Sequence, residues 1–544
     1  MTTAPIAQDQ GRKIGALRLA TLPLGWVVFA IALILALLLA LPGQTVTTKY
    51  VNDLFIFLDG AYRIMEGQVP NQDFHSSLGP LAFYVPAVGY ALTGQLGAAM
   101  PVGMAIAVVL LGVVGAHIIG SRMRALTGVP LAVFLLLVAT VPLNPGEGIG
   151  DLSFAMFYNR LGWTAVGLLL VMYLPPRASD STHTYLDALC ATALTAFLIY
   201  LKASYGLVAL GFVVFTLTNR SSWRWSALAL ALLAATAIVV ELVWRGSAGY
   251  LDDVMLARDV SGELPDFRRL ATIVLQNLAD IAVYLVFAAL LVALRRSFRD
   301  FLFMGFCGAT GVLIIEQNFQ IVGIVTLVAG GAVAAEMLAI HLERRGLHLG
   351  LPLLLGILML PVTVQNGIAL TLHSGLALTN QGDEIALPNL AGVHLVKLNN
   401  EGLYRNFSRY NQSIADGAGA LASLDTAVER VVVFDFVSPF TAGMGLVPPE
   451  GDSPWYHWGR TLDDEVYPPA ESILADAKII MDPKWAIEAW TAGGMRRVYA
   501  SYLDANFTLE RETADWRVYV RRASTSNRPE NANSVTRQST SAQP

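Results

Sequence analysis

The sequence predicts an α-helical polytopic membrane protein with about eleven spans and a small α/β soluble domain near its C-terminal end. Of its 544 residues, 55% are hydrophobic and 14% are charged, a composition outside the usual range of soluble domains. Apolar runs close to the ~20 residues that a membrane helix needs recur as far as about residue 372. Beyond that point these runs stop, and shorter segments with strand and helix patterns follow.

The membrane region is predicted to cover residues 21–372, after a polar segment formed by residues 1–20. That segment carries Arg12, Lys13 and Arg18, which favours a cytoplasmic N-terminus by the positive-inside rule. The apolar runs that predict spans are 24–41, 97–120, 129–143, 160–174, 185–201, 203–218, 225–244, 271–294, 301–315, 319–341 and 349–371.

Leu78–Thr93 is also apolar, but charge placement predicts that it lies along the outer membrane surface and does not cross. With this segment in the interface, the arginine clusters that follow later spans, such as the one at Arg122, all face the cytoplasm. Pro80 and Pro86 also interrupt a straight crossing helix. We therefore expect residues 43–96 to form an outer loop that contains juxtamembrane helices.

Residues 373–522 are expected to form the small α/β domain, on the same outer side. Residues 471–478 have helical spacing. Strands are predicted from short β-branched and aromatic runs at residues 431–434, 479–481 and 516–520. The tail, residues 523–544, is rich in Ser, Thr and Asn and has the composition of a disordered segment.

The first outer loop concentrates titratable groups in a chain that has few of them. Asp53, Asp59, Asp73 and His75 all lie there. A carboxylate within reach of an acceptor hydroxyl can take its proton while a glycosidic bond breaks, so Asp53 and Asp59 are candidate general bases. They stand six positions apart, about 240° round a regular helix, so only one of them can face a given site. Asp53 could equally serve to cap the helix that it begins.

Residues 50–90 resemble the first outer loop of the GT-C superfamily of membrane glycosyltransferases. The matching features are Asp53 near the start of a helix, Gly67 with Pro70, the pair Asp73-Phe74, and the segment that begins at Gly79-Pro80-Leu81. The most similar members would be bacterial enzymes akin to protein O-mannosyltransferases (family 39-like). Two departures are Leu54, where that family has a second acidic residue, and Asn71, where it often has a tyrosine. The first departure leaves both Asp53 and Asp59 open as the base.

That resemblance implies an inverting transfer from a polyprenyl-phosphate sugar, on the extracytoplasmic side of a bacterial inner membrane. A lipid phosphate at the membrane edge needs a cation, and Lys202 and Arg160 are the candidates, although each could instead anchor its helix. The residues expected to contact substrate are Asp73, His75, Tyr158, Asn159, Glu316, Gln317, Asn318 and His457. Asp73 and His75 could equally be structural residues of the loop, and Glu316, Gln317 and Asn318 could instead cap helix ends. No cofactor is expected, and nothing in the sequence indicates a divalent cation.

The function predicted from the sequence is therefore a polyprenyl-phosphate-dependent glycosyltransferase whose acceptor is a glycan, a lipid or a protein. The alternatives are a glycolipid transporter or flippase, and a polymerase or ligase of surface polysaccharide. Transporters commonly carry charges at the bilayer midplane and internal repeats, whereas the charges here collect at the outer edge and no repeat is visible. A net charge of −5 gives no basic footprint for nucleic acid. Neither a zinc-binding HExxH motif nor a P-loop occurs.

Overall fold

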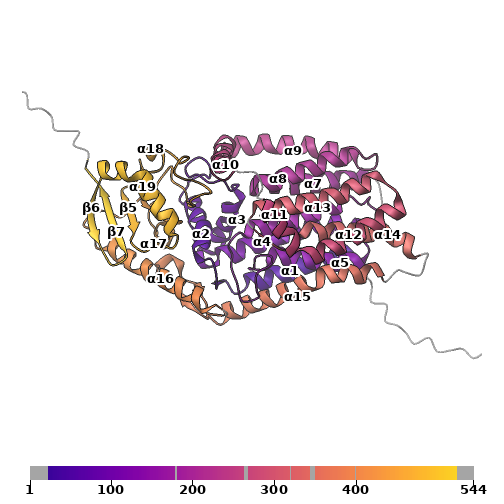
Figure 1. The fold of residues 1–544 in the computed structure, drawn as a ribbon, viewed down its shortest axis with the longest axis horizontal. Coiled ribbons are helices and arrows are strands. Elements are labelled where there is room, and N and C mark those ends of the chain that lie inside the picture. Colours follow the sequence, from indigo (N-terminus) through magenta and orange to yellow (C-terminus); the bar gives the residue numbers. More distant parts are fainter. Residues whose placement is uncertain are drawn as a thin grey trace, which may run out of the picture.

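The chain forms a long helical bundle with a smaller α/β region at one end of it (Figure 1). The computed structural model describes residues 23–177, 181–262, 267–318, 320–343, 350–398 and 400–523. The predicted cytoplasmic segment 1–20 and nearly all of the predicted tail 523–544 lie outside the described residues. The predicted architecture, a helical membrane region followed by a small α/β region, is confirmed.

Every apolar run read from the sequence coincides with a helix. The bundle helices are α1 (Leu24–Ala40), α4 (Leu96–Arg122), α5 (Ala125–Thr140), α6 (Phe157–Val171), α7 (Ser181–Leu201), α8 (Ala203–Leu217), α9 (Trp223–Trp244), α11 (Phe267–Gln276), α12 (Leu278–Arg295), α13 (Phe298–Gln317), α14 (Val325–Glu343) and α15 (Gly350–Leu378). In the described part of the chain, six of them are both long and apolar enough to cross a bilayer. The count of about eleven spans stays a prediction.

Several bundle boundaries differ from the predicted ones; α14, for example, begins at Val325 and not at 319. The run 271–294 is divided at Asn277 into α11 and α12, where the Asn277 side chain forms hydrogen bonds with the loop between α13 and α14. Its Nδ2 donates to the Ile321 carbonyl at 2.6 Å, and its Oδ1 accepts from the Gly323 amide at 3.1 Å. At the other end of the bundle, α15 continues beyond residue 372 to Leu378.

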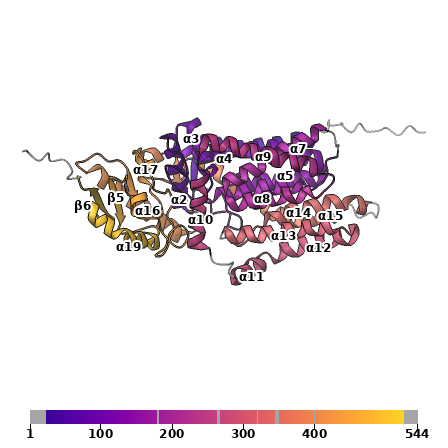
Figure 2. The ribbon, with the colours of Figure 1, turned by 90° about the horizontal axis from the view of Figure 1, so that it is seen from above.

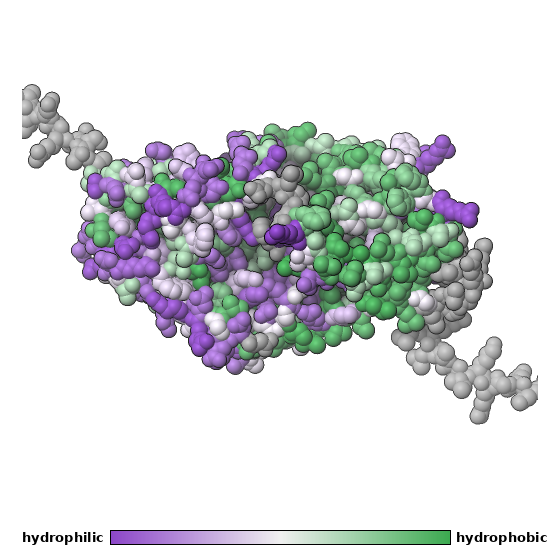
Figure 3. All heavy atoms as spheres, in the orientation of Figure 1, coloured by the Kyte–Doolittle hydropathy of each residue, from purple (hydrophilic) through white to green (hydrophobic). Residues whose placement is uncertain are grey.

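The flank of the bundle is apolar, as contact with lipid requires. Large hydrophobic side chains are exposed on several helices, among them Leu110, Val243, Leu285 and Ile357. Figure 3 shows a hydrophobic surface over the bundle and a hydrophilic surface over the α/β region. An exposed apolar area of this extent would be a liability in water and is satisfied by acyl chains.

Three further helices lie where the bundle meets the α/β region: α2 (Val51–Met65), α3 (Leu81–Thr93) and α10 (Ser247–Ser261). With 13 residues, α3 is roughly 20 Å long; that it does not cross the membrane stays a prediction. It packs against the start of α4, where a Cβ on Gly89 would meet the Ala99 carbonyl oxygen at 2.1 Å. Helix α10 was not predicted. Figure 2 shows it at the junction, with α11 at the edge of the bundle.

A small sheet joins the segment after α1 to the segment after α15. Strand β1 (Thr45–Thr47) directly follows α1, yet it pairs in parallel with β3 (Val393–Leu395), which in turn pairs with β2 (Asp383–Glu384). A short 3-10 helix, η1 (Pro388–Leu390), lies between β2 and β3. The outer loop and the C-terminal region are therefore parts of one structure.

A second sheet, of four strands in the order β4-β5-β7-β6, forms the core of the α/β region. Its strands are β4 (Val431–Val433), β5 (Ile479–Pro483), β6 (Phe507–Glu512) and β7 (Trp516–Arg521). Helix α16 (Glu401–Ala422) packs on one face through the Trp516 indole, which donates to the Ser413 carbonyl at 2.7 Å. Helix α19 (Ala489–Asn506) covers the other face with Met495 and Tyr499. The short helices are α17 (Phe440–Met444) and α18 (Ala470–Ile473).

The three predicted strands are confirmed, and β6 is additional. The predicted helix at residues 471–478 is wrong beyond its first turn. Helix α18 ends at Ile473 because the following residues form the turn that leads into the buried strand β5. The helical spacing there reflects burial of Leu474 and Ala477 in an irregular segment.

Candidate active site

Asp53 is a partly buried carboxylate near the start of α2. It lies in the first turn of α2, which begins after Tyr50, a residue held in the left-handed region at φ 56°. The residues on both sides of it, Asn52 and Leu54, are buried. Among the described residues, nothing forms a hydrogen bond or an ion pair with the Asp53 side chain. Burial raises its pKa to about 7, and the positive charge of Arg460 opposes that shift.

The start of α6 lies against the face of α2 that carries Asp53. Phe57 is one helical turn after Asp53 and therefore shares its face. The Phe57 ring centroid lies 4.9 Å from that of Phe157 and 6.0 Å from that of Tyr158. Tyr158 is close enough to Asp53 for the two side chains to interact electrostatically. The base candidate thus faces the first turn of a bundle helix.

Lys202 brings a cation to the same place from the turn between α7 and α8. Its Nζ lies 5.3 Å from the centroid of the Tyr158 ring, a cation–π contact, and donates a hydrogen bond to the Asn318 side-chain oxygen. Asn318 Nδ2 then donates to the Tyr205 hydroxyl at 3.0 Å. Burial lowers the pKa of Lys202 to about 7, and Arg460 acts in the same direction. Lys202 is thereby fixed over Tyr158 by neutral groups.

The α/β region contributes Arg460 and Glu488. Arg460 lies in a tight loop in which the Gly459 amide donates to the Leu462 carbonyl at 2.8 Å, with Gly459 at φ 78°. Burial lowers the pKa of Arg460, and the nearby Tyr158 and Asp53 raise it. Burial also raises the pKa of Glu488, and Arg460 lowers it. Two cations, Lys202 and Arg460, therefore reach the same place from opposite regions of the molecule.

Asp435 holds the segment that carries Glu488. Its carboxylate accepts hydrogen bonds from the amides of Phe436 at 2.7 Å, Ile487 at 3.0 Å and Glu488 at 3.2 Å. Even so, burial raises the pKa of Asp435 to about 7. The Asp435 carboxylate thereby holds the end of β4 to the residues just before α19.

Asp59 lies on another side of α2, inside a buried ion-pair cluster. Its Oδ2 accepts from Arg63 Nε at 2.7 Å, and Arg63 also binds Asp452 of the α/β region. Asp59 is 1% exposed and Arg63 0%. Asp53 and Asp59 thus lie on different sides of α2, as the expected rotation of about 240° requires. The structure does not bring Asp59 to the group around Tyr158 and Lys202.

Asp73 and His75 shape the loop after α2. Asp73 Oδ2 accepts from the Val69 amide at 2.7 Å and closes a turn. His75 Nδ1 lies 3.1 Å from Asp253 of α10, and that hydrogen bond raises the pKa of His75. The loop is thus fastened to α10, and neither side chain joins the group around Asp53.

Asn159 and Arg160 follow Tyr158 into the bundle and are 1% and 0% exposed. Arg160 Nη1 donates to Asn144 Oδ1 at 2.8 Å and to the Ala155 carbonyl at 3.0 Å. Within the described residues, Nε and Nη2 of Arg160 and both side-chain polar atoms of Asn159 have no hydrogen-bond partner. These two residues lie beneath the group around Asp53, with hydrogen-bonding capacity to spare.

The remaining candidates have different surroundings. Glu316 is partly exposed and Gln317 exposed at the end of α13, whereas Asn318 is buried and holds Lys202. The His457 ring packs against Phe436 with centroids 5.2 Å apart, and burial lowers the pKa of His457 to about 4, so it is neutral at pH 7. Asn318 therefore joins the site directly, and His457 supports the loop that carries Arg460.

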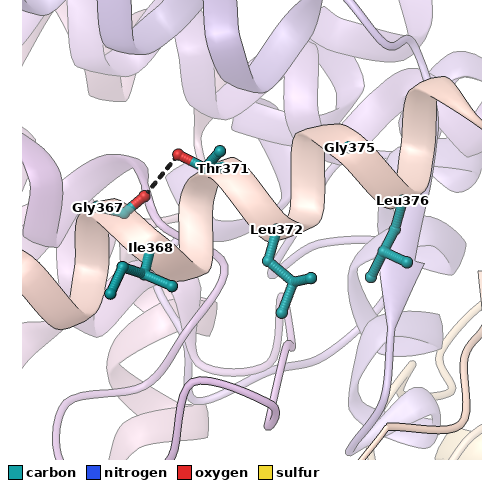
Figure 4. A pocket seen from close by; sticks show the side chains of 6 residues that line it. All are labelled: Gly367, Ile368, Thr371, Leu372, Gly375 and Leu376. Atoms are coloured by element: carbon teal, nitrogen blue, oxygen red, sulfur yellow. Dashed lines mark hydrogen bonds between the residues drawn. The ribbon is translucent and has the colours of Figure 1, made fainter.

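Two cavities in the described part of the chain lie away from Asp53. One, of about 220 Å³, is mostly apolar and lies between α5, α12, α14 and α15, with Asp280 and Gln365 in its wall. The other is an open groove of about 540 Å³ along α15, lined by Ile368, Leu372 and Leu376 (Figure 4). Nor do three histidine, cysteine, aspartate or glutamate side chains meet as metal ligands would in the described residues.

Sequence reasoning missed Arg460, Glu488 and Arg269. The positive charge of Arg269, from α11, acts on Arg460. Arg460 stands just after an aromatic segment, 454–458. Nothing in the sequence connects Arg460 or Glu488 to Asp53, because the link is made through space across some 400 positions.

No protein-family model and no curated protein matches the chain. Among solved structures, the chain is similar to ArnT from Cupriavidus metallidurans bound to undecaprenyl phosphate, with 14% identity, coverage of 93% of this chain and 99% of that chain, and a TM-score of 0.44. The apo state of the same protein gives 16% identity, coverage of 91% and 97%, and a TM-score of 0.46. An oligosaccharyltransferase from Archaeoglobus fulgidus, in a complex with Zn and sulfate, gives 11% identity, coverage of 84% and 67%, and a TM-score of 0.36. At these identities and TM-scores the likenesses are distant.

Proposed function

We propose that the protein is an inverting glycosyltransferase that moves a sugar from a polyprenyl-phosphate carrier to an acceptor on the extracytoplasmic side of the membrane. One observation carries the proposal. Asp53, a carboxylate without a partner among the described residues and with a pKa of about 7, lies beside Tyr158, Lys202 and Arg460 where the apolar bundle meets the α/β region.

The base is suited to its task because its pKa lies near neutral pH. A general base works best when it is largely deprotonated and still basic enough to hold the proton it receives. A carboxylate with an ordinary pKa near 4 would meet only the first condition. Burial without a paired cation gives Asp53 both properties.

The two cations are suited to a phosphate leaving group. As the bond between the sugar and the carrier phosphate breaks, negative charge grows on the phosphate oxygens. Lys202 provides a compact charge and Arg460 a planar donor group, both of which bind phosphate well. Lys202 approaches from the membrane side and Arg460 from the α/β side, so a phosphate at the surface of the bilayer can contact both.

The transfer balances as a single displacement. The acceptor hydroxyl oxygen forms a bond to the anomeric carbon, and the bond from that carbon to the carrier phosphate oxygen breaks. The hydroxyl proton goes to Asp53, and the electron pair leaves on polyprenyl phosphate. One displacement inverts the anomeric configuration. The buried Arg160 and Asn159 support the first turn of α6, and with it the Tyr158 ring.

The experiment that tests the proposal uses purified full-length protein in nanodiscs. Radiolabelled hexose, N-acetylhexosamine and pentose, each linked to polyprenyl phosphate, are incubated with membrane extract as a pool of acceptors. We expect one donor to be consumed, with free polyprenyl phosphate released and label moved to a new product. A labelled donor that is carried across a proteoliposome membrane without chemical change would instead show a transporter.

The variant Asp53→Asn should abolish release of polyprenyl phosphate. Glu66→Gln is the matched control, since Glu66 lies at the end of the same helix and is exposed. It should retain full transfer. Binding of polyprenyl phosphate, followed by native mass spectrometry, should survive in both variants. Full transfer by Asp53→Asn would remove the base from the proposal.

A further inference from the structure

We propose that Arg63 is a positioning residue that fixes the Asp53 end of α2 relative to the loop that carries Arg460. The proposal rests on the function proposed above, and it concerns a contact that lies outside the reacting group. Arg63 bridges the two regions of the molecule that supply the base and one of the cations.

The contact is a fully buried fork. Arg63 Nη1 and Nη2 donate to the two carboxylate oxygens of Asp452 at 2.6 and 3.0 Å, while Nε donates to Asp59 at 2.7 Å. Arg63 Nη1 also donates to the Pro449 carbonyl at 3.1 Å, and Gln68 Nε2 donates to that same carbonyl at 2.9 Å. A bidentate pair fixes orientation as well as distance.

A short, well-fastened path leads from the fork to Arg460. The Asp452 carbonyl accepts from the His75 amide at 2.9 Å, so the loop after α2 holds it from a second side. The next residue, Ser453, donates its amide to the Tyr456 hydroxyl at 3.0 Å, and the Tyr456 amide donates to the Phe436 carbonyl at 2.9 Å. Arg460 follows in the tight turn at Gly459.

Stability alone does not account for this arrangement. Two carboxylates share one cation in a site closed to water, and apolar residues of similar volume could join the two regions at equal or lower cost. Packing of that kind would hold the regions together but would leave their rotation less defined. The charged fork fixes one relative orientation of the two regions, and that orientation brings Asp53 and Arg460 together.

A shift of the loop would change how strongly Arg460 acts on Asp53. The charged and titratable groups that act on Asp53 are Arg460 and Glu488 from the α/β region and Glu147 from the loop before α6, and Tyr158 of α6 lies beside it. Arg460 is the cation that lowers the pKa of Asp53. Moving it away would raise that pKa, and more of the base would be protonated at a given pH.

The test measures kcat/KM against pH for Arg63→Lys and Asp452→Glu, with the donor identified in the screen above. Both variants keep every charge and disturb only the fork, and Asp452→Glu remains available if Arg63→Lys does not fold. Arg409→Lys is the matched control, because Arg409 pairs with Asp515 inside the α/β region and takes no part in the fork. Size-exclusion profile and melting temperature confirm that each variant is folded.

We expect the acid limb of the profile to move up by about half a unit to one unit in the two fork variants. Activity at pH 6 would then fall about 3- to 9-fold and activity at pH 8 less than about twofold, whereas Arg409→Lys would keep the wild-type limb. A uniform loss at every pH in the fork variants would overturn the positioning role. If the wild-type profile has no acid limb, or if Asp53→Asn is active, the proposed function fails first, so the two failures are distinguishable.

Discussion

Helix α2 carries two aspartates, Asp53 in its first turn and Asp59 near its middle, that differ only in their surroundings. Asp53 is partly exposed and has no partner among the described residues, and it lies beside two cations that come from other regions. Asp59 is buried and paired with Arg63, which is itself held by Asp452. A buried carboxylate that is paired with a cation fixes structure. A partly exposed carboxylate without such a pair can still accept a proton. From this difference we assign the proposed proton transfer to Asp53 and a structural role to Asp59.

The largest expected effect is the loss of transfer in Asp53→Asn. Asparagine keeps the shape and the capping ability of aspartate at a helix start, but its amide does not accept a proton at neutral pH. We expect kcat to fall by about 10²- to 10⁴-fold, the usual contribution of a positioned base. Rates with the labelled donor, at equal binding of polyprenyl phosphate, measure it. If Asp53→Asn is active and Asp59→Asn is inactive, the base is Asp59 and not Asp53.

Replacing Lys202 should come next in size. Lys202→Met removes a charge that we propose contacts the donor phosphate, so donor affinity should fall by roughly 30- to 1000-fold. Lys202→Arg should retain part of it, because the charge survives while the geometry changes. Lys397→Met is the control, since Lys397 is exposed on the α/β region. Titration with polyprenyl phosphate measures the effect, and equal affinity in Lys202→Met would return Lys202 to the role of a helix anchor.

The pH dependence of kcat/KM should be bell-shaped with its maximum near pH 7. Asp53 must be deprotonated to act, so activity is lost as pH falls below its pKa of about 7. Lys202 must be protonated, so activity is also lost as pH rises above its pKa of about 7. Far from the maximum, each pH unit should cost about tenfold. Lys202→Arg should remove the alkaline limb and keep the acid limb, which tells the two groups apart.

The smallest effect on activity is expected at Asp59. In Asp59→Asn the side-chain oxygen can still accept from Arg63, so transfer per folded molecule should change less than tenfold. Stability should fall by about 1 to 3 kcal/mol, as for a buried hydrogen bond to a charged group. Arg63→Met leaves two carboxylates buried without a cation and should cost about 3 to 5 kcal/mol. Denaturant midpoints in one detergent compare the two, and equal midpoints would show that the cluster is not a clamp.

Much of this molecule could be predicted from local patterns. The apolar runs predicted the bundle helices because a lipid-facing helix must satisfy its own backbone and carry an apolar surface. Short β-branched runs predicted three strands, and a rotation argument separated Asp53 from Asp59. Helices α16 and α19 and strand β6 were missed, although the apolar positions of α16 (Phe407, Tyr410, Ile414, Leu421) do recur at helical spacing and could have predicted it.

The site was only partly predictable, for a different reason. Lys202 and Asn318 were predicted separately, each from its place at the outer end of a span. Their direct contact is made by folding, and so is the approach of Arg460 to Asp53. Positions that are hundreds of residues apart leave no periodicity in a single sequence, so only the folded chain shows that they share one site.

The pairing of β1 with β3 has a consequence for the time course of synthesis. β1 leaves the ribosome directly after the first membrane helix, but its partner strand follows about 350 residues later. Until then the first outer loop has no edge to pair with, and Arg460 does not yet exist. The newborn chain therefore holds Asp53 without Arg460 until translation is nearly complete. If Asp53 and Arg460 act as proposed, competence to react with the donor is gained only then, which protects the donor pool from half-made enzyme.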